Sequence, residues 1–549
     1  MAATERVDPT RMAHPRVFWL GLSIITVGVA LTTYEFRALT AAEGTPYVLT
    51  PRMILGLVVD LVGTVMAAWA VLPHGWLEHY RRRRAGVPSE PALETEREAS
   101  PSGAEALDAM DHAKLNKGHW VMMLRMYAGL VIDTMKPATL GFMLPGMQAE
   151  YGLSPTTVSL FPLAAVIGLT IGSVLFGMLG DLVGRRASFI FTALVFATTA
   201  PCGLMPDYPW HLVTCFLMGL AAGGELPLIY TMLAESTPAK HRGWAGVVLG
   251  GIGGLSGYLV AGLLARWIEP TFSWRALWLP NLPTALFMLW LLRYVHESPR
   301  FLLHMGFVEE ARRAMAEVGV VASATAKAAA DASVTVKDLL VGPLRGITAT
   351  LCLYGFAWGL CNWGFITWLP GMLREAGFDA SMSSQLLTLS AACALPATVI
   401  AALAYGFWSS RWTATLSAVA TAAALLGFWI CAPYMEGRTW LIVALTATLF
   451  VASSSMIGVL APYSVELYPT ALRGLGSGVV AGSSKSGGIV GPLLVGALLG
   501  AGAGAGLPAL VIAIPVAIAS VAIGVRGTET RGRSLEELAA RAAAIEKAA

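Results

Sequence analysis

Long apolar runs separated by short polar connections dominate the sequence. A helix needs about 20 apolar residues to cross a hydrocarbon core of about 30 Å, and each of these runs approaches or exceeds that length. The pattern predicts fourteen membrane-spanning helices, near residues 17–37, 53–75, 119–145, 155–176, 188–205, 210–233, 244–266, 276–295, 346–372, 383–408, 413–433, 439–462, 474–500 and 506–525. The chain is therefore predicted to be an all-α membrane protein.

Two long polar segments divide the predicted spans into groups of two, six and six. Residues 76–118 are rich in Ala, Glu, Ser and Pro, which is typical of a linker. Residues 296–345 begin with apolar residues at helical spacing among charges, which predicts one or two amphipathic helices on the membrane surface. The predicted division is an N-terminal two-helix extension (1–75), a cytoplasmic linker (76–118), a first six-helix half (119–295), a central cytoplasmic loop (296–345), a second six-helix half (346–525) and a cytoplasmic tail (526–549).

The distribution of lysine and arginine orients the spans. The run Arg81–Arg84 and most other loop cations lie in connections on one side, and few lie on the other. Because positive residues are retained on the cytoplasmic side, both termini are predicted to be cytoplasmic. The first apolar run lacks a clear cleavage signal and is predicted to be a retained helix and not a signal peptide.

Composition supports this class and excludes others. Only 13% of residues are charged and 56% are hydrophobic, whereas about 25% of the residues of soluble domains are charged. The net charge of +3 gives no indication of nucleic-acid binding. The six cysteines lie in apolar runs without metal-ligand spacing, and no ATP-binding motif or spaced nucleophile and base is present. The sequence thus predicts no disulfide, metal or cofactor, and no enzymatic activity.

Charged motifs occur at the inner ends of several spans. The segment "GMLGDLVGRRAS" (177–188) has glycines that allow a tight turn, together with Asp181, which can pair with a cation or a helix N-terminus to hold one state of an inner gate. The segment "GLAAGGELPLIYTMLAESTPAKHRG" (219–243) places acidic residues near prolines and ends in Arg-Gly. A related pattern, "APYSVELYPTALRGLGSG" (461–478), occurs in the second half.

These motifs, with "ESPRFLL" (297–303), resemble those of the major facilitator superfamily, in the branch that contains aromatic acid:proton symporters, sugar porters and synaptic-vesicle-protein-2-like proteins. The resemblance covers roughly residues 119–525 and leaves the first two spans outside. It implies two six-helix halves that alternate access to a site near the membrane midplane. It also implies that gating involves Asp181, Arg185, Arg186, Glu235, Arg242, Glu466 and Arg473.

Charged residues at membrane depth mark candidate transport positions. Asp133 and Lys136 lie three residues apart on one predicted helix face, and the resemblance implies that Glu225 faces them from the fourth span of the same half. Two carboxylates and one ammonium leave one acid able to bind a proton, so Asp133 and Glu225 are predicted to carry the coupling proton. In the alternative interpretation, Asp133 and Lys136 only neutralise each other.

Lys136 also bears on the substrate. In the aromatic acid symporters this span typically has a second acidic residue, and Lys136 occupies that position here. A buried ammonium favours an anionic ligand, because the ion pair offsets part of its desolvation cost. If Lys136 instead forms ion pairs with both Asp133 and Glu225, a neutral ligand is allowed.

The second half offers further candidate substrate contacts. Tyr354, Asn362 and Trp363 lie on a span whose position resembles the pore-lining seventh helix, and Lys485 is a cation within a later span. Asn362 is the strongest candidate, since an amide at membrane depth needs a partner. In the alternative interpretation, the aromatic residues serve only in packing, and Lys485 anchors its helix at the inner membrane face.

Together these features predict a secondary active transporter that imports a small organic anion, such as an aromatic carboxylate, with protons across a bacterial inner membrane. Its partners are then the substrate, protons and the bilayer, with a protein partner or self-association through the N-terminal helix pair left open. One alternative is a sugar or organic-cation carrier or a proton-driven exporter on the same fold. Another is a non-transporting receptor or assembly factor.

Overall fold

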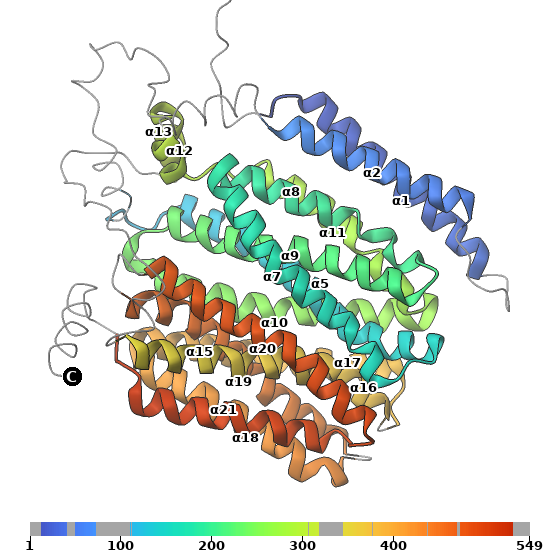
Figure 1. Ribbon diagram of the computed structural model, residues 1–549. Coiled ribbons are helices and arrows are strands. Elements are labelled where there is room, and N and C mark those ends of the chain that lie inside the picture. Colours follow the sequence, from blue (N-terminus) through green and yellow to red (C-terminus); the bar gives the residue numbers. More distant parts are fainter. Residues whose placement is uncertain are drawn as a thin grey trace, which may run out of the picture. The chain divides into compact units, whose positions relative to one another are not determined.

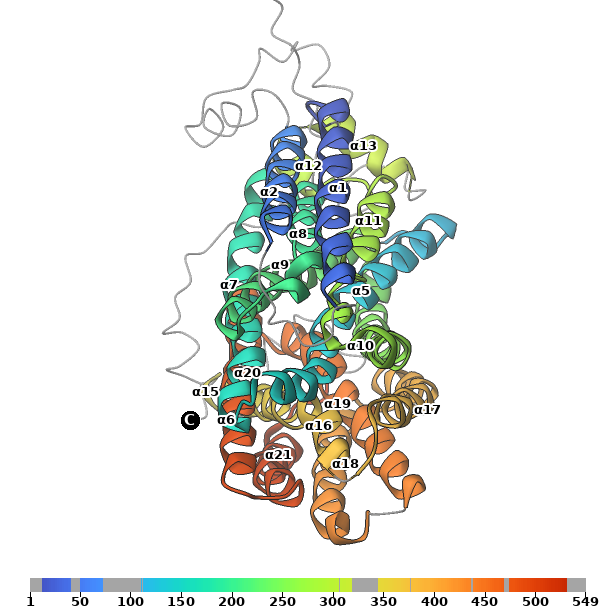
Figure 2. The same cartoon turned by 90° about the vertical axis from the view of Figure 1, so that its right-hand side faces the viewer.

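The computed structural model describes residues 12–40, 50–72, 110, 112–305, 307–317, 344–375, 377–435, 438–468 and 473–530. The Arg81–Arg84 run, most of the predicted linker and nearly all of the predicted tail lie outside these residues. Every regular element in the described part of the chain is helical (Figures 1 and 2).

The helices follow the apolar runs. They are α1 (Pro15–Thr40), α2 (Pro51–Val71), α5 (Lys117–Tyr151), α6 (Pro155–Val158), α7 (Leu160–Val183), α8 (Arg185–Ala197), η2 (Ala200–Leu204), α9 (Tyr208–Ser236), α10 (Ala239–Phe272), η3 (Trp274–Trp278), α11 (Asn281–Leu292), α12 (Pro299–Met305), α13 (Val308–Glu317), α15 (Arg345–Gly359), η4 (Leu360–Ile366), α16 (Thr367–Glu375), α17 (Ala380–Phe407), α18 (Ser410–Cys431), η5 (Ala432–Tyr434), α19 (Thr439–Leu467), α20 (Arg473–Gly500) and α21 (Gly506–Arg526).

Local chemistry fixes several helix starts. The side chains of Thr50, Ser154 and Asp379 accept hydrogen bonds from the backbone N–H three residues later, which caps α2, α6 and α17. Proline follows the cap in α2 and α6, where its missing N–H and fixed φ suit the first turn.

Eleven helical segments among the described residues are long and apolar enough to cross a membrane. They coincide with eleven of the fourteen predicted spans. The other three predicted spans correspond to α5, which carries Asp133 and Lys136, to α11, which has only 12 residues, and to the glycine-rich α20. Fourteen crossings and cytoplasmic termini therefore stay predictions.

The structure divides into two compact units. The first comprises residues Met1–Gly129, Ile171–Arg242 and Trp278–Ala329, and the second comprises Leu130–Thr170, Gly243–Leu277 and Ala330–Ala549. The long helices α5, α7 and α10 contribute to both units, so these units differ from the predicted six-helix halves. The division into halves stays a prediction.

In the first unit, α1 and α2 lie side by side along their length (Figures 1 and 2). Their backbones approach closely where Gly21 faces Gly63 and Gly28 faces Gly56, since a Cβ at any of these positions would lie within 3 Å of the opposite backbone. α2 packs against α8 and α1 against η2, so the N-terminal pair is packed onto this unit. α8 in turn packs against α9 and α11.

In the second unit, α18 packs against α21, α15 against α20, and α17 against α19 (Figure 1). The predicted seventh span is broken into α15, the π-helical segment η4 and α16. π-Helical segments are rare and occur frequently at functional sites. This segment contains Asn362 and Trp363.

Two short helices, α12 and α13, lie at the start of the predicted central loop. In α13, Ala311, Ala314 and Met315 are buried, whereas Arg312 and Arg313 are exposed. The helix is therefore amphipathic, as the spacing of its apolar residues predicts.

Candidate functional site

The turn between α7 and α8 brings a charged cluster together at the side predicted to be cytoplasmic. Gly184 makes this turn with φ of +103°, a conformation that favours glycine, and it provides no side chain to cap α8. A Cβ on Gly184 would also overlap with the carboxylate of Glu297. The glycine thus allows the backbone conformation of the turn and leaves the space that the Glu297 carboxylate occupies.

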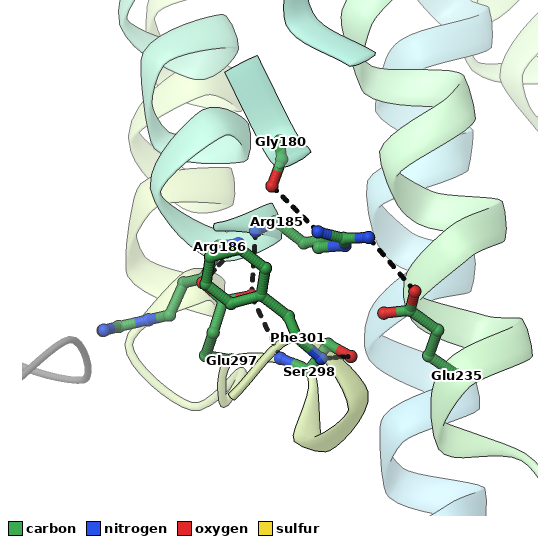
Figure 3. Close-up of polar contacts among 7 residues, drawn as sticks. All are labelled: Gly180, Arg185, Arg186, Glu235, Glu297, Ser298 and Phe301. Atoms are coloured by element: carbon green, nitrogen blue, oxygen red, sulfur yellow. Dashed lines mark hydrogen bonds and ion pairs between the residues drawn. The ribbon is translucent and has the colours of Figure 1, made fainter. Parts of the chain in front are cut away.

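Glu297 caps the N-terminus of α8 from a distant part of the chain (Figure 3). The backbone N–H of Arg185 donates to Glu297 Oε1 at 2.8 Å, and that of Arg186 donates to Oε2 at 3.1 Å. The backbone N–H of Ser298 donates to Oε1 at 3.0 Å. A helix N-terminus has unsatisfied N–H donors and a partial positive charge, so a carboxylate is stabilised there.

The helix N-terminus favours the ionised form of Glu297, whereas burial disfavours it. Only 3% of Glu297 is exposed, and the loss of solvation raises its pKa above the ordinary value of 4.5. The three backbone N–H donors and the Arg185 guanidinium partly oppose that increase. Burial and the donors thus act in opposite directions on the protonation of Glu297, which joins α8 to the segment that follows α11.

Arg185 links three helices. Its Nη1 donates to Gly180 O of α7 at 3.0 Å, and its Nη2 lies 3.3 Å from Glu235 Oε1 of α9 (Figure 3). The guanidinium also lies over the ring of Phe301 in α12, 5.0 Å from its centroid. One side chain thus connects the end of α7, the end of α9 and the first helix of the central loop.

Arg186 connects α8 to the end of α11, because its Nε donates to Leu292 O at 3.2 Å. Nearby, His296 Nδ1 lies 2.5 Å from Glu317 Oε2 of α13. Burial lowers the pKa of His296, the Glu317 carboxylate opposes this decrease, and the Arg186 cation reinforces it. These contacts join α8, α11 and α13 at one end of the unit.

The structure brings together three of the predicted gating residues, Arg185, Arg186 and Glu235. Asp181 lies in α7, Arg242 in α10, and Arg473 at the start of α20, and their side chains lie outside the described part of the structure. Glu466 belongs to a separate cluster in the second unit.

This second cluster contains two carboxylates. Tyr405 Oη of α17 donates to Glu466 Oε2 of α19 at 2.8 Å, and Thr530 Oγ1 lies 2.5 Å from the same oxygen. Glu529 caps α18, where it accepts hydrogen bonds from the Ser410 N–H at 2.9 Å and from the Ser409 hydroxyl. Burial raises the pKa of Glu466, and the two hydroxyl groups of Thr530 and Tyr405 partly oppose this effect.

Glu297 and Glu529 belong to these two clusters, but the sequence motifs did not indicate a position for either of them. Glu297 lies a few residues after α11 and Glu529 a few residues after α21, and each is followed by a hydroxyl residue, in "ESPR" and "ETRG". Each caps the helix that begins at Arg185 or at Ser410. The pattern of Glu followed by Ser or Thr also occurs at Glu235, so it does not by itself identify either residue.

The charged residues predicted at membrane depth are buried. The exposed fraction is 5% for Asp133, 1% for Lys136 and 0% for Glu225. Asp133 and Lys136 lie in α5 within the second unit, and Glu225 lies in α9 within the first. Their joint action stays a prediction, but the cost of burying ionised groups makes a purely incidental placement unfavourable.

The other predicted substrate contacts differ in their surroundings. Asn362 and Trp363 lie in η4, and Lys485 is half-buried in α20. Tyr354 is fully buried, and its hydroxyl donates to Ala414 O of α18 at 3.0 Å. This contact supports the packing alternative for Tyr354, since its only donor proton is already used.

Two further ion pairs lie at the opposite ends of the spans. Arg374 Nη2 of α16 lies 2.5 Å from Glu269 Oε1 of α10. Arg275 Nη2, after α10, lies 2.6 Å from Glu150 Oε1 of α5. Both arginines lie in or next to connections on the side predicted to be outer, where the sequence has few cations.

The chain is similar to known transporters in sequence and in fold. The family model described as Major Facilitator Superfamily matches residues 126–492. The chain is 26% identical over 446 residues to the niacin transporter NiaP of Acinetobacter baylyi. This alignment covers 79% of this chain and 99% of the relative. It is 26% identical over 405 residues to a gallate transporter of Pseudomonas putida, covering 71% and 88%.

Among solved structures, the proton:xylose symporter XylE bound to a bromo-deoxyglucose superposes with a TM-score of 0.61 at 17% identity. The match covers 78% of this chain and all of XylE, and it shows a shared fold. The expected resemblance to aromatic acid transporters is confirmed, and the fold is shared with a sugar porter. The chain belongs to the Major Facilitator Superfamily of secondary transporters, and it is a multispan integral membrane protein and not an enzyme.

Proposed function

We propose that this transporter imports a small aromatic carboxylate together with protons across a bacterial cytoplasmic membrane, with both termini in the cytoplasm. The observation that carries the proposal is the burial of Lys136 within α5, three residues from Asp133. A fully buried ammonium is stabilised by negative charge nearby, and a substrate carboxylate would add to that charge during transport.

The relatives support the substrate class. Niacin and gallate, named for two of them, are both small aromatic rings that carry a carboxyl group. An aromatic ring also suits the surroundings of η4, where Trp363 is nearly buried beside Asn362. We assign carboxylate recognition to Lys136 and ring contacts to Asn362 and Trp363, with Lys485 as a second cation. Tyr354 is left to packing, because it is fully buried and its hydroxyl donates to Ala414 O.

Asp133 and Glu225 are assigned to the coupling proton. A carboxyl group buried near a cation changes protonation when the charge around it changes, so arrival of an anionic substrate at Lys136 favours proton uptake. Gating is assigned to the cluster of Arg185, Arg186 and Glu235, joined by Asp181 and Arg242 in the first half. Glu466 and Arg473 have the corresponding role in the second.

Ligand binding by the purified full-length protein tests the assignment of Lys136. Nicotinate and nicotinamide form a matched pair, because they differ only in a carboxylate and a neutral amide. The wild type is expected to bind nicotinate at least tenfold more tightly, which corresponds to about 1.4 kcal/mol. Lys136→Gln should remove this preference.

Lys117→Gln is the matched control, because Lys117 is exposed at the start of the same helix. It should leave the preference unchanged. Equal binding of both compounds by the wild type, or an unchanged preference in Lys136→Gln, would favour the alternative of a sugar or organic-cation carrier or an exporter. Absence of any transport in vesicles for all classes of ligand would favour a receptor or assembly factor.

A further inference from the structure

A continuous chain of oxygen atoms connects Glu466 with Glu529. Glu466 Oε2 lies 2.5 Å from Thr530 Oγ1, which lies 2.8 Å from Ser410 Oγ. Ser410 Oγ lies 2.6 Å from Glu529 Oε1. All three distances are those of O–H···O hydrogen bonds.

The chain contains more contacts than hydroxyl protons. Each of the three contacts needs one hydrogen between its two oxygens, but Thr530 and Ser410 supply only two. The Tyr405 hydroxyl uses its own proton in a separate bond to Glu466, and the Thr530 N–H donates to Ser410 Oγ at 3.0 Å. The third proton must therefore come from one of the two carboxyl groups.

The surroundings of the two carboxyl groups differ. Glu529 accepts from the Ser410 N–H, the Ser409 hydroxyl and the Ser410 hydroxyl at the N-terminus of α18, where negative charge is favoured. Glu466 has hydroxyl neighbours from Tyr405 and Thr530 among the described residues. The proton therefore belongs on Glu466, which donates to Thr530, which donates to Ser410, which donates to Glu529.

The first unit shows the contrasting arrangement. There the helix capped by Glu297 begins with Arg185, whose guanidinium lies beside Glu235 at the end of α9. In the second unit, the helix capped by Glu529 begins with Ser410, and Glu466 lies at the end of α19. A hydroxyl thus replaces the cation, so no charge from this position neutralises Glu466.

Among the described residues, two other ionisable side chains near Glu466 have hydrogen bonds to other groups. Arg411, the next residue of α18, donates to Gly524 O of α21 and stacks on Trp412. Tyr463 Oη of α19 donates to Thr528 O at 2.6 Å. Glu529 is the nearby group that raises the pKa of Glu466 by its charge, in addition to burial.

We infer that Glu466 and Glu529 form a proton-binding site that holds one proton between them, on Glu466, separate from the positions assigned to transport coupling. Loss of this proton leaves two hydroxyl hydrogens for three contacts, so one of the contacts made by Thr530 is lost. Ionisation therefore loosens the segment after α21 from α18 or α19.

Unfolding of the purified full-length protein, followed against temperature at a series of pH values, tests this site without any substrate. In Glu466→Gln the amide donates to Thr530 as the protonated acid does. We expect this variant to match the wild type in mildly acidic solution and to be more stable than it as the pH rises. Glu529→Gln is the matched control and should be less stable than the wild type at every pH, because an amide N–H then faces the donors of α18.

Infrared spectroscopy gives a second readout that does not depend on stability. The carbonyl stretching band of a protonated carboxylic acid should be present in the wild type, weaker in Glu466→Gln and retained in Glu529→Gln. A Glu466→Gln variant that is destabilised equally at every pH and leaves the infrared band unchanged would overturn the inference. Loss of the band only in Glu529→Gln would overturn its assignment to Glu466.

Discussion

Gly184 and Glu297 lie in contact only because Gly184 has no side chain, and this contact places the Glu297 carboxylate on the backbone N–H groups of Arg185 and Arg186. A residue in the turn between α7 and α8 and a residue more than a hundred positions later thus form one element of the predicted inner gate.

Gly184→Ala is expected to weaken this contact. Alanine is disfavoured at φ of +103° by about 1–2 kcal/mol, and its Cβ would displace the Glu297 carboxylate. The variant should have a lower melting temperature and slower transport. Gly177→Ala is the control, since a Cβ there meets no described atom within 4 Å and should have little effect. Equal behaviour of the two variants would contradict the role of Gly184.

Removal of the cap should destabilise the protein in a pH-dependent manner. Glu297→Ala leaves donors at the N-terminus of α8 unsatisfied, which costs about 1–2 kcal/mol. Because the pKa of Glu297 is raised in the folded state, the folded protein binds more protons than the unfolded chain above about pH 4.5. The stability contributed by Glu297 therefore falls as the pH rises through its folded pKa.

Thermal unfolding of wild type and Glu297→Ala across this pH range measures the effect. The difference in stability should be largest in acid and become smaller as the pH increases. A difference that grows with pH would mean that folding lowers the pKa of Glu297.

The pair of Glu269 and Arg374 joins α10 to α16, and its loss should be costly. Arg374→Gln leaves the buried Glu269 carboxylate without its cation, and breaking a buried pair costs about 3–5 kcal/mol. Because Arg374 is partly exposed, we expect a loss of stability near the lower end of this range. The double variant with Glu269→Gln should recover most of this loss. Additive effects of the two substitutions in a double-mutant cycle would show that the pair contributes no coupling energy.

The N-terminal helix pair should depend on its glycines. Gly28→Ala places a Cβ 2.6 Å from Gly56 O, and overpacking of this kind costs about 1–3 kcal/mol. Gly254→Ala in α10 is a control, because its Cβ would meet no described atom within 4 Å. The melting temperatures of the two variants are compared by thermal unfolding in detergent. An unchanged melting temperature in Gly28→Ala would mean that the pair is not part of the cooperative unit.

The sequence predicts the helices well because membrane depth demands long apolar runs, and eleven of these runs form segments able to span. Local motifs indicated Arg185, Arg186 and Glu235, which the structure brings together, while their role in a gate stays a prediction. The roles of Glu297, Glu529 and the pair of Glu269 and Arg374 were not, because each depends on contacts between residues far apart in the chain. The π-helical segment η4 also had no recognised signal in "LCNWGFI".

Proton movement driven by substrate tests the proposed transport function most directly. The protein is reconstituted in liposomes that contain a pH-sensitive dye, and nicotinate, gallate, a neutral sugar and an organic cation are added in turn. Internal acidification with the carboxylates alone, abolished in Asp133→Asn and retained in Lys117→Gln, is the predicted result. Acidification only with the sugar or the cation, or undiminished acidification in Asp133→Asn, would contradict it.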